Sequence, residues 1–195
     1  MSEPAIKSLD KLTSFSQEID ALELLRKQRR SKVKKYPSVS VLVSTVRPDD
    51  LTNLLQQLVS QSLPLFELQL GLHAVKLNAS HKKLIRVLEK RKISVNIYTF
   101  DRENSLGTIL SSLAQASSGE FIAKMDDDDY YGPEHLRDLL DAALDTGADV
   151  VGKAMNYVYL EPLQLTVRRF SPNGIQAVEL WSDWVCGGTI LAKRA

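Results

Sequence analysis

The hydrophobic positions between Val39 and Gly147 alternate between two periods, one typical of strands and one typical of helices. Val39–Thr45 is a short apolar run rich in β-branched residues, which predicts a buried strand. The leucines that follow it are spaced three and four residues apart, which predicts a helix with one apolar face. The same pair of patterns recurs along this part of the chain. The sequence therefore predicts strands at 39–45, 66–75, 93–100 and 121–125, each followed by a helix whose apolar residues lie within 51–59, 84–88, 109–113 or 136–144.

This alternation of strands and helices indicates an α/β fold. Strands joined by helices form right-handed crossovers, so we expect a mostly parallel central sheet with helices on both faces, which is a three-layer α/β/α architecture. Ligands of such sheets bind beyond the carboxyl ends of the strands. The Ser44–Arg47 turn and the acids after Met125 both lie at carboxyl ends, so we expect them to line one crevice.

The residues after Gly147 follow a different pattern. Residues 150–155, 157–160 and 165–170 read as strands without intervening helices, and residues 187–191 form a last apolar strand. This part of the chain therefore predicts antiparallel or irregular structure added to the alternating core.

The segment before Pro37 also differs from the rest. Apolar residues at positions 15, 19, 22 and 25 recur at helical spacing, and seven basic residues without an acid follow between Arg26 and Lys35. A helix that leads into a basic run either packs on a neighbour as a solvated helix or touches an anionic surface such as a membrane. We therefore divide the chain into a helical, basic N-terminal arm at 1–36 and an α/β domain at 37–195.

Four consecutive acids, Asp126 to Asp129, follow the predicted strand at 121–125. Two unit charges about 4 Å apart repel by roughly 1 kcal/mol in water and about 4 kcal/mol near a protein surface, so the run requires compensating charge. In an extended segment alternate side chains share a face, which would place Asp126 with Asp128 and Asp127 with Asp129. A pair of carboxylates suits Mg²⁺ or Mn²⁺, completed by water and phosphate oxygens. The alternative is a solvated turn, because acids also stabilise the N-terminus of the helix that follows.

Composition narrows the class of protein. The chain has 195 residues, of which 44% are hydrophobic and 25% are charged, as expected of a globular domain with a core. Its net charge of +1 gives no overall attraction to nucleic acid, so no nucleic-acid partner is expected. The single cysteine, Cys186, excludes an intrachain disulfide and suits a reducing compartment. The sequence shows neither a signal-peptide pattern nor an apolar stretch of about 20 residues. We therefore expect a cytoplasmic protein, with peripheral membrane contact through residues 1–36 as the alternative location.

Two other ligand-binding patterns fail on their context. Residues 147–154 approach a phosphate-binding P-loop, but Ala154 stands where a Mg²⁺-binding Ser or Thr is needed, and the pattern ends a helix instead of starting one. The segment beginning at Asp127 approaches a calcium loop, but Tyr131 and Asp138 stand where Asp or Asn and Glu are needed. Neither pattern therefore predicts a site.

Several segments, taken in order, resemble the family 2 glycosyltransferases of the GT-A fold. That family has an early strand ending in a Pro-Thr-x-Asn-Arg-like turn. An Ala-x-Gly-Glu-Tyr-Ile segment follows later, then a strand ending in Asp-x-Asp-Asp and a Pro-Glu-x-Leu segment. The resemblance covers roughly residues 38–195 and implies a Rossmann-like GT-A domain. The residues that carry it are Val39–Arg47, Asn104-x-x-Gly107, Ser118–Ile122, Asp126-x-Asp128-Asp129 and Pro133–Leu136.

The resemblance implies an enzyme that transfers a sugar from a nucleoside-diphosphate sugar to an acceptor hydroxyl, with inversion at the anomeric carbon. Thr45, Arg47, Asp126 and Asp127 would contact the nucleotide, and Asp128 with Asp126 would hold Mn²⁺ or Mg²⁺ at the diphosphate. A divalent cation stabilises the charge that develops on a departing diphosphate. The acceptor would be a glycan or another hydroxyl compound, and a carboxylate must accept its proton.

Two departures from the family pattern bear on the mechanism. Residues 71–76 lack the acid that the family carries after its second strand, so either His73 takes that place or the contact is absent. The family's catalytic base follows the Gly-Gly-Thr segment, and this chain reaches Ala195 without it. We therefore expect a domain that is incomplete at its C-terminus, with Asp183 as the candidate base and Glu179 as the alternative. The competing hypotheses are a non-catalytic nucleotide-sugar-binding scaffold and a nucleotidyltransferase-like phosphate enzyme.

Overall fold

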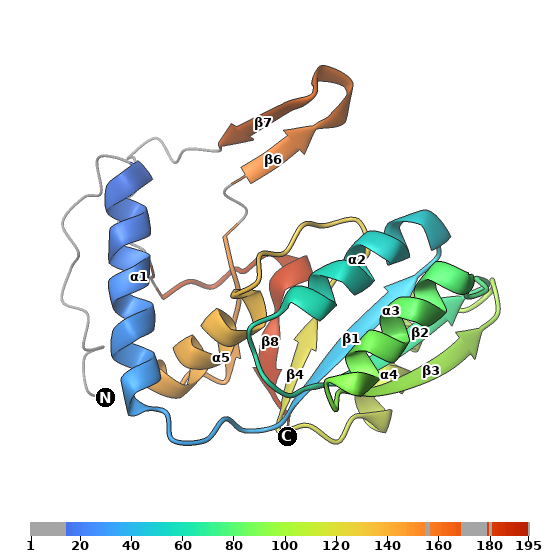
Figure 1. Ribbon diagram of the computed structural model, residues 1–195, viewed down its shortest axis with the longest axis horizontal. Helices are drawn as coiled ribbons and strands as arrows, with labels where there is room; N and C mark the ends of the chain where they lie inside the picture. The colour runs from blue at the N-terminus through green and yellow to red at the C-terminus, as the bar shows by residue number, and fades with distance from the viewer. Residues whose placement is uncertain (1–14, 155–156, 169–178, 180, 195) are drawn as a thin grey trace.

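The computed structural model describes residues 15–154, 157–168, 179 and 181–194 of the chain, and its centre is a six-stranded sheet (Figure 1). The strands of this sheet are β1 (Val39–Thr45), β2 (Glu67–His73), β3 (Ser94–Phe100), β4 (Phe121–Lys124), β5 (Val150–Val151) and β8 (Leu191–Lys193). They lie in the order β3-β2-β1-β4-β8-β5. The first four are parallel to one another, whereas β8 is antiparallel to both of its neighbours, β4 and β5.

Helices cover both faces of the sheet, which confirms the predicted three-layer α/β fold with a mostly parallel sheet. The helices are α1 (Phe15–Lys32), α2 (Pro48–Ser60), α3 (Ala79–Lys90), α4 (Leu106–Ala116) and α5 (His135–Thr146). Apolar residues of α2, α3 and α5 share one core cluster with Val41 and Val43 of β1. Because strand side chains alternate between faces, Leu42 points the other way and packs against α4.

Local signals explain where several helices begin and end. The side chain of Asn78 accepts a hydrogen bond from the His81 amide at 2.9 Å, and the His81 ring accepts one from the Asn78 amide at 3.2 Å. This reciprocal cap starts α3. Ser105 caps α4 by accepting a hydrogen bond of 3.1 Å from the Thr108 amide. Gly147 ends α5 in the left-handed region at a φ of 69°, which agrees with the helix end that the sequence predicts.

The part of the chain after α5 is less regular than the sequence predicts. The strand expected at 187–191 is instead a 3₁₀ turn, η2 (Gly187–Thr189), followed by the short β8. The strand expected at 150–155 is reduced to β5. The strands expected at 157–160 and 165–170 form a hairpin of β6 (Tyr157–Leu160) and β7 (Leu165–Arg168), joined through η1 (Glu161–Leu163). This hairpin projects from the domain (Figure 1). Residue 155 and residues 169–170, which end two of the predicted strands, lie outside the described residues.

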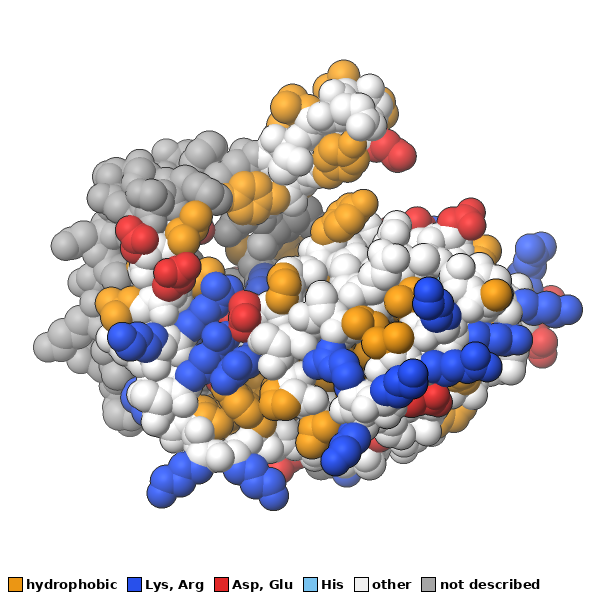
Figure 2. Space-filling model, in the orientation of Figure 1, with side chains coloured by type: hydrophobic (Ala, Val, Ile, Leu, Met, Phe, Trp, Pro, Cys, Tyr) orange, Lys and Arg blue, Asp and Glu red, His pale blue; other side chains and the backbone are white. Residues whose placement is uncertain are grey.

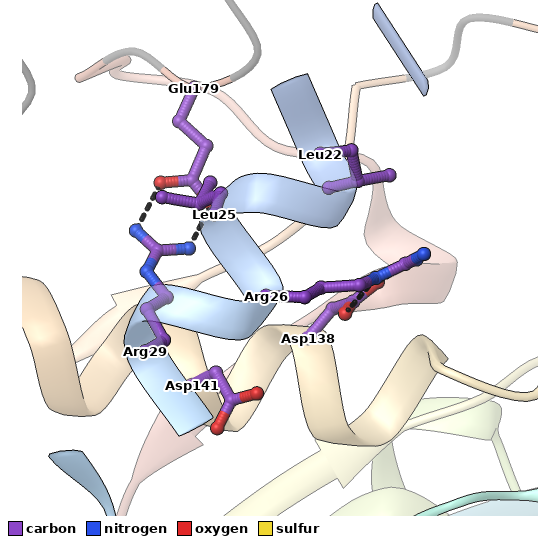
Figure 3. Close-up of a pocket in the computed structure, with 7 residues that line it drawn as sticks. All are labelled: Leu22, Leu25, Arg26, Arg29, Asp138, Asp141 and Glu179. Carbon is purple, nitrogen blue, oxygen red and sulfur yellow. Dashed lines mark hydrogen bonds and ion pairs between the residues drawn. The ribbon is translucent and has the colours of Figure 1, made fainter. Parts of the chain in front are cut away.

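Helix α1 crosses over α5 and is held there by ion pairs (Figures 1 and 3). Arg26 binds both oxygens of Asp138, at 2.8 and 2.7 Å. The buried Arg29 forms two bonds of 2.5 Å with Glu179 and a third bond of 3.1 Å with Asp145. The basic run of the arm therefore serves largely to pack α1 on the domain. Arg30 and Lys32 of α1 also form ion pairs with acids of the domain. The acids at the start of α5 and within it that pair with the four α1 cations are called the α5 acids below, and they are Glu134, Asp138, Asp141 and Asp145.

No helix among the described residues is both long enough and apolar enough to cross a membrane.

Candidate active site

The four acids Asp126–Asp129, called the acid turn below, lie beside the carboxyl end of β1. The parallel register of β1 and β4 aligns Leu42 with Lys124, the last residue of β4. Three residues further along each segment the chain reaches Thr45, at the end of β1, and Asp127, in the turn after β4. The Thr45 hydroxyl donates a hydrogen bond of 2.7 Å to the Asp127 carboxylate. The turn after β1 and the acid turn therefore meet, as the parallel topology predicts.

Arg47 joins two of the four acids. Its Nη1 atom lies 2.8 Å from the Asp127 carboxylate and 2.7 Å from the Asp128 carboxylate. Asp127 is buried, whereas the Arg47 and Asp128 side chains are 47% and 54% exposed. The charge of Asp127, followed by that of Asp128, raises the pKa of Arg47 and outweighs burial, which acts to lower it. Asp127 is thus fixed inside the site, whereas Asp128 stays open to a ligand from solvent.

The other two acids of the turn converge on Gly188 of η2. A Cβ atom added at Gly188 would lie 2.4 Å from an Asp129 carboxylate oxygen and 2.9 Å from an Asp126 carboxylate oxygen. The alternation expected of an extended segment does not hold, because the chain turns at Asp127 and Asp128. The turn pairs Asp126 with Asp129 and Asp127 with Asp128.

The charge of the acid turn is only partly compensated. Lys124 pairs with Asp126 and also donates a hydrogen bond of 3.2 Å to the Gly187 carbonyl. Asp129 forms no ion pair within the described part of the chain. Partial burial, followed by the charges of Asp126 and Asp128, raises the pKa of Asp129 above its ordinary value. The turn therefore holds more negative charge than its neighbouring side chains neutralise.

Tyr131 fixes the geometry of the acid turn through hydrogen bonds of its hydroxyl group. Its buried hydroxyl accepts a hydrogen bond of 2.7 Å from the Asp126 amide and donates one of 2.8 Å to the Gly188 carbonyl. Burial, the largest cause, raises the pKa of Tyr131, so its proton stays on the oxygen. The ring packs against His135 at a centroid distance of 4.6 Å, and burial lowers the pKa of that histidine to about 3. Both rings are therefore neutral supports of the site.

Two glutamines of α2 hold the loop that contains the turn. The Gln57 side chain accepts a hydrogen bond of 2.5 Å from the Tyr131 amide. The Gln61 side chain donates one of 3.0 Å to the Gly132 carbonyl and accepts one of 3.0 Å from the Leu136 amide. Sequence reasoning missed both glutamines, because they lie more than 70 positions away from these partners.

The arrangement fits a divalent cation whose coordination a substrate completes. Asp126 and Asp129 bring hard oxygen atoms to one point, where Gly188 leaves space that a side chain would fill. The described residues contain no group of three or more His, Cys, Asp or Glu side chains that could hold a metal. Mg²⁺ and Mn²⁺ accept one or two carboxylates together with water and phosphate oxygens. A cation here would thus require the phosphates of a ligand.

The candidate bases, Glu179 and Asp183, and the candidate nucleotide contact, His73, lie on other segments of the chain than the acid turn. Glu179 is bound to Arg29 on α1, which removes it as a candidate base. Asp183 is exposed, between the exposed Trp181 and Trp184, on the segment that leads to η2, and its role stays a prediction. His73 ends β2, and its ring lies 3.1 Å from the Arg102 carbonyl, so its proposed nucleotide contact also stays a prediction.

Comparisons with known proteins show the family and agree with the fold. A family model described as glycosyl transferase family 2 matches residues 41–182. A mannosyltransferase structure, PcManGT from Pyrobaculum calidifontis in complex with GDP-Man and Mn²⁺, is similar with a TM-score of 0.50 and 16% identity, over 71% of this chain and 44% of that one. TarS from S. aureus in complex with UDP-GlcNAc is similar with a TM-score of 0.51 and 21% identity, over 60% of this chain and 34% of that one. The chain thus spans less than half the length of either structure. The search of curated proteins found no match.

Proposed function

Because the chain belongs to glycosyl transferase family 2, we propose that its acid turn binds a nucleoside-diphosphate sugar, whose sugar is transferred to an acceptor hydroxyl. The observation that carries this proposal is that the four acids of the turn differ in their contacts and in how far their charge is compensated. Asp127 and Asp128 are held by Arg47, whereas Asp126 and Asp129 converge on Gly188 with incomplete charge compensation. Such a site is suited to a ligand that brings its own cation.

The proposed donor site uses residues from both strand ends. Thr45, Arg47 and Asp127 form a connected group that would position the nucleotide, and the half-exposed Arg47 guanidinium can also reach an anionic ligand. Asp128 with Asp126 would hold Mn²⁺ or Mg²⁺, and the structure adds Asp129 as a further carboxylate beside Asp126. The presence of Mn²⁺ with GDP-Man in the PcManGT structure supports this proposal.

The proposed reaction is a direct displacement with inversion at the anomeric carbon. The acceptor oxygen forms a bond to that carbon while the bond to the diphosphate oxygen breaks. A divalent cation bound at the turn would stabilise the charge on the leaving diphosphate. The acceptor proton would pass to a carboxylate, for which Asp183 is the candidate in this chain. Its exposure on the segment leading to η2 is consistent with a position open to an acceptor.

The remaining expectations from the sequence also stand as proposals. We place the protein in the cytoplasm and keep the division between an arm at 1–36 and a domain at 37–195. Four of the seven basic residues in the arm pair with acids, which leaves Lys27, Lys34 and Lys35 exposed. Contact of the arm with a membrane would rest on these three lysines.

Calorimetric titration of UDP-, GDP- and dTDP-sugars, with and without Mn²⁺, tests the proposed function. We expect one of these donors to bind only when Mn²⁺ is present and to be turned over, by transfer or by slow hydrolysis. Binding without any turnover would favour the non-catalytic scaffold. Metal-dependent binding of a nucleoside triphosphate in place of every sugar nucleotide would favour a nucleotidyltransferase-like enzyme. If no nucleotide bound in a metal-dependent way, the proposed donor site would be wrong.

A further inference from the structure

The segment from Lys76 to Lys92, which contains α3 and its two flanks, is strongly basic. It has seven basic residues and one acid, Glu89, so its net charge is +6 when histidine is neutral. The whole chain has a net charge of only +1, so the other residues together carry −5. The near-neutral composition of the chain therefore conceals a local concentration of positive charge.

This charge lies on the solvent side of α3. The helix buries His81, Ile85 and Leu88 against the domain. Lys82, Arg86 and Lys90 follow one another at intervals of four residues, which places them in one row on the opposite side. Figure 2 shows Lys and Arg side chains gathered over the part of the molecule where Figure 1 places α3. The exposed cations, called the α3 face below, are Lys76, Lys82, Lys83, Arg86, Lys90 and Lys92.

The side chains of the α3 face have no partners within the described part of the chain. No ion pair or side-chain hydrogen bond joins any of the six to another residue there. Arg91, the seventh basic residue, differs because its guanidinium donates to the carbonyls of Val59 and Gln61. The two acids at the start of α2, Asp49 and Asp50, lie near the first turn of α3, because Thr52 is bonded to His81, and neither reaches a lysine. The positive charge of this face is thus uncompensated along most of its length.

We propose that the α3 face docks the protein on a membrane surface that contains anionic lipids. A row of exposed cations on a convex helix can meet a flat anionic surface with all members at once. The row from Lys82 to Lys90 extends for about 12 Å along the helix, at a rise of about 1.5 Å per residue. The arm was the first candidate for such contact, but its arginines are bound to acids, whereas the α3 cations are free to face lipid headgroups.

A membrane fits this face better than nucleic acid does. Residues 76–92 contain no Phe, Tyr or Trp, so the face lacks the stacking platforms on which proteins bind single-stranded nucleic acid. Five of its six cations are lysines, which act as point charges without the planar fork that favours base edges. The α3 face also covers one side of the sheet, whereas the acid turn lies at the carboxyl edge. Docking would therefore leave the proposed donor site beside the contact and open.

Co-sedimentation with lipid vesicles tests this proposal in the full chain. The probes are vesicles of phosphatidylcholine alone and of phosphatidylcholine mixed with phosphatidylglycerol. We expect the protein to bind only the mixed vesicles, and raised salt to weaken the binding. The triple variant Lys82→Gln, Lys83→Gln, Lys90→Gln should bind about 100-fold more weakly, since each cation near an anionic surface contributes about a fivefold effect.

The arm provides a control with the same change in net charge. The variant Lys27→Gln, Lys34→Gln, Lys35→Gln also loses three exposed lysines, and it should bind the mixed vesicles within about twofold of the unmodified chain, because the α3 face stays intact. A third variant with arginine at 82, 83 and 90 should retain binding, and circular dichroism should show all three folded.

Three results would overturn the proposal. The first is equal binding to both kinds of vesicle. The second is an equal loss of binding in the α3 and arm variants, which would indicate a general effect of net charge. The third is tighter binding of an RNA or DNA oligonucleotide than of the mixed vesicles, lost with the α3 lysines, which would assign the face to nucleic acid. None of these results depends on the proposed donor site, so they do not bear on the transferase proposal.

Discussion

Two acidic regions adjoin in this chain, and they differ in how their charge is compensated. The α5 acids receive four cations from α1, at distances of 2.5 to 3.2 Å for their shortest ion pairs. The acid turn has the same number of carboxylates but only two cations, Arg47 and Lys124, among the described residues. The charges of the α5 acids are therefore balanced by α1 in a structural contact. The acid turn, by contrast, is left with uncompensated negative charge among the described residues.

The pKa values follow the same division. For Glu134, hydrogen bonds from Ser62 and Arg30 outweigh burial and lower the pKa of the carboxyl. For Asp145, bonds from Lys32 and Arg29 outweigh burial with the same result. These groups bind protons less readily in the folded chain, so they stabilise it above their ordinary pKa. This contribution is lost as the pH falls from 4.5 for Glu134, and from 3.8 for Asp145, through the lowered values.

The pKa of Asp129 is shifted in the opposite direction. Burial and the neighbouring acids raise its pKa, so the folded chain binds its proton more readily than the unfolded chain does. Ionised Asp129 therefore destabilises the fold, and this cost appears as the pH rises from 3.8 through the raised value. At neutral pH the acid turn therefore carries negative charge that favours the binding of a cation, and this charge lowers the stability of the folded chain.

The largest expected effect is on the acid turn. Asp126→Asn and Asp128→Asn should each remove the metal-dependent part of nucleotide binding, a loss of about 100-fold or more, because even residues that only support metal ligands contribute about 10- to 100-fold. The free energy of unfolding should change by less than about 1 kcal/mol, since Asp128 is half exposed. Calorimetry and thermal unfolding measure the two effects. Unchanged affinity in either variant would remove that residue from the site.

The second test fills the space at Gly188. Gly188→Ala should weaken nucleotide binding about 10-fold or more, because the new methyl group would force apart the carboxylates of Asp126 and Asp129. The matched control is Gly187→Ala, where an added Cβ would meet nothing within 4 Å. Equal affinity in the two variants would show that the convergence on Gly188 does not matter for binding.

The third test disrupts the contact between α1 and the α5 acids. Asp141 is buried and accepts hydrogen bonds from Tyr36 at 2.8 Å and from Arg30 at 3.2 Å. Asp141→Asn should lower the stability by about 2 kcal/mol, or roughly 4–8 °C in Tm, because it leaves Arg30 with less compensating charge. Nucleotide binding by the folded variant should be unchanged. Loss of binding without loss of stability would contradict the assignment of α5 to structure.

The smallest expected effect concerns Asp129. Asp129→Asn should raise the Tm of the metal-free chain by about 1–2 °C at pH 7, because it removes a like charge from the turn. Since the native carboxyl is protonated in acid, the gain should disappear near pH 3. Thermal unfolding at both pH values measures the difference. A lower Tm at pH 7 would mean that the turn is already neutralised in the free protein.

The sequence was sufficient to predict the core of the fold and the position of the site. The alternating periods set the order of strands and helices, and parallel topology brings the ends of β1 and β4 together, so Thr45, Arg47 and the acids could be grouped in advance. The pairing of the acids could not be predicted, because it depends on distant contacts. Tyr131 reaches Gly188 across 57 positions, and that contact fixes a turn where alternation predicts an extended segment.

The role of α1 could not be predicted either, because it also depends on contacts between residues far apart in the sequence. Its basic run could be read as a membrane or solvated segment, because the acids that bind it lie more than 100 positions away. The Gly-Gly-Thr segment was expected to be a strand, but the Gly188 carbonyl is bound by Tyr131 and the segment forms a 3₁₀ turn against the acids. Apolar pattern alone does not distinguish a buried turn from a short strand.

The central claim is that the acid turn lacks a cation that a nucleotide ligand supplies together with its diphosphate. Electron paramagnetic resonance of Mn²⁺ tests it most directly, with nucleoside diphosphate alone as the reference. Addition of the protein should lower the free Mn²⁺ signal by up to one equivalent per chain beyond that reference, and Asp126→Asn should abolish the decrease while Asp141→Asn retains it. A Mn²⁺ signal that is the same with and without the protein would contradict the claim.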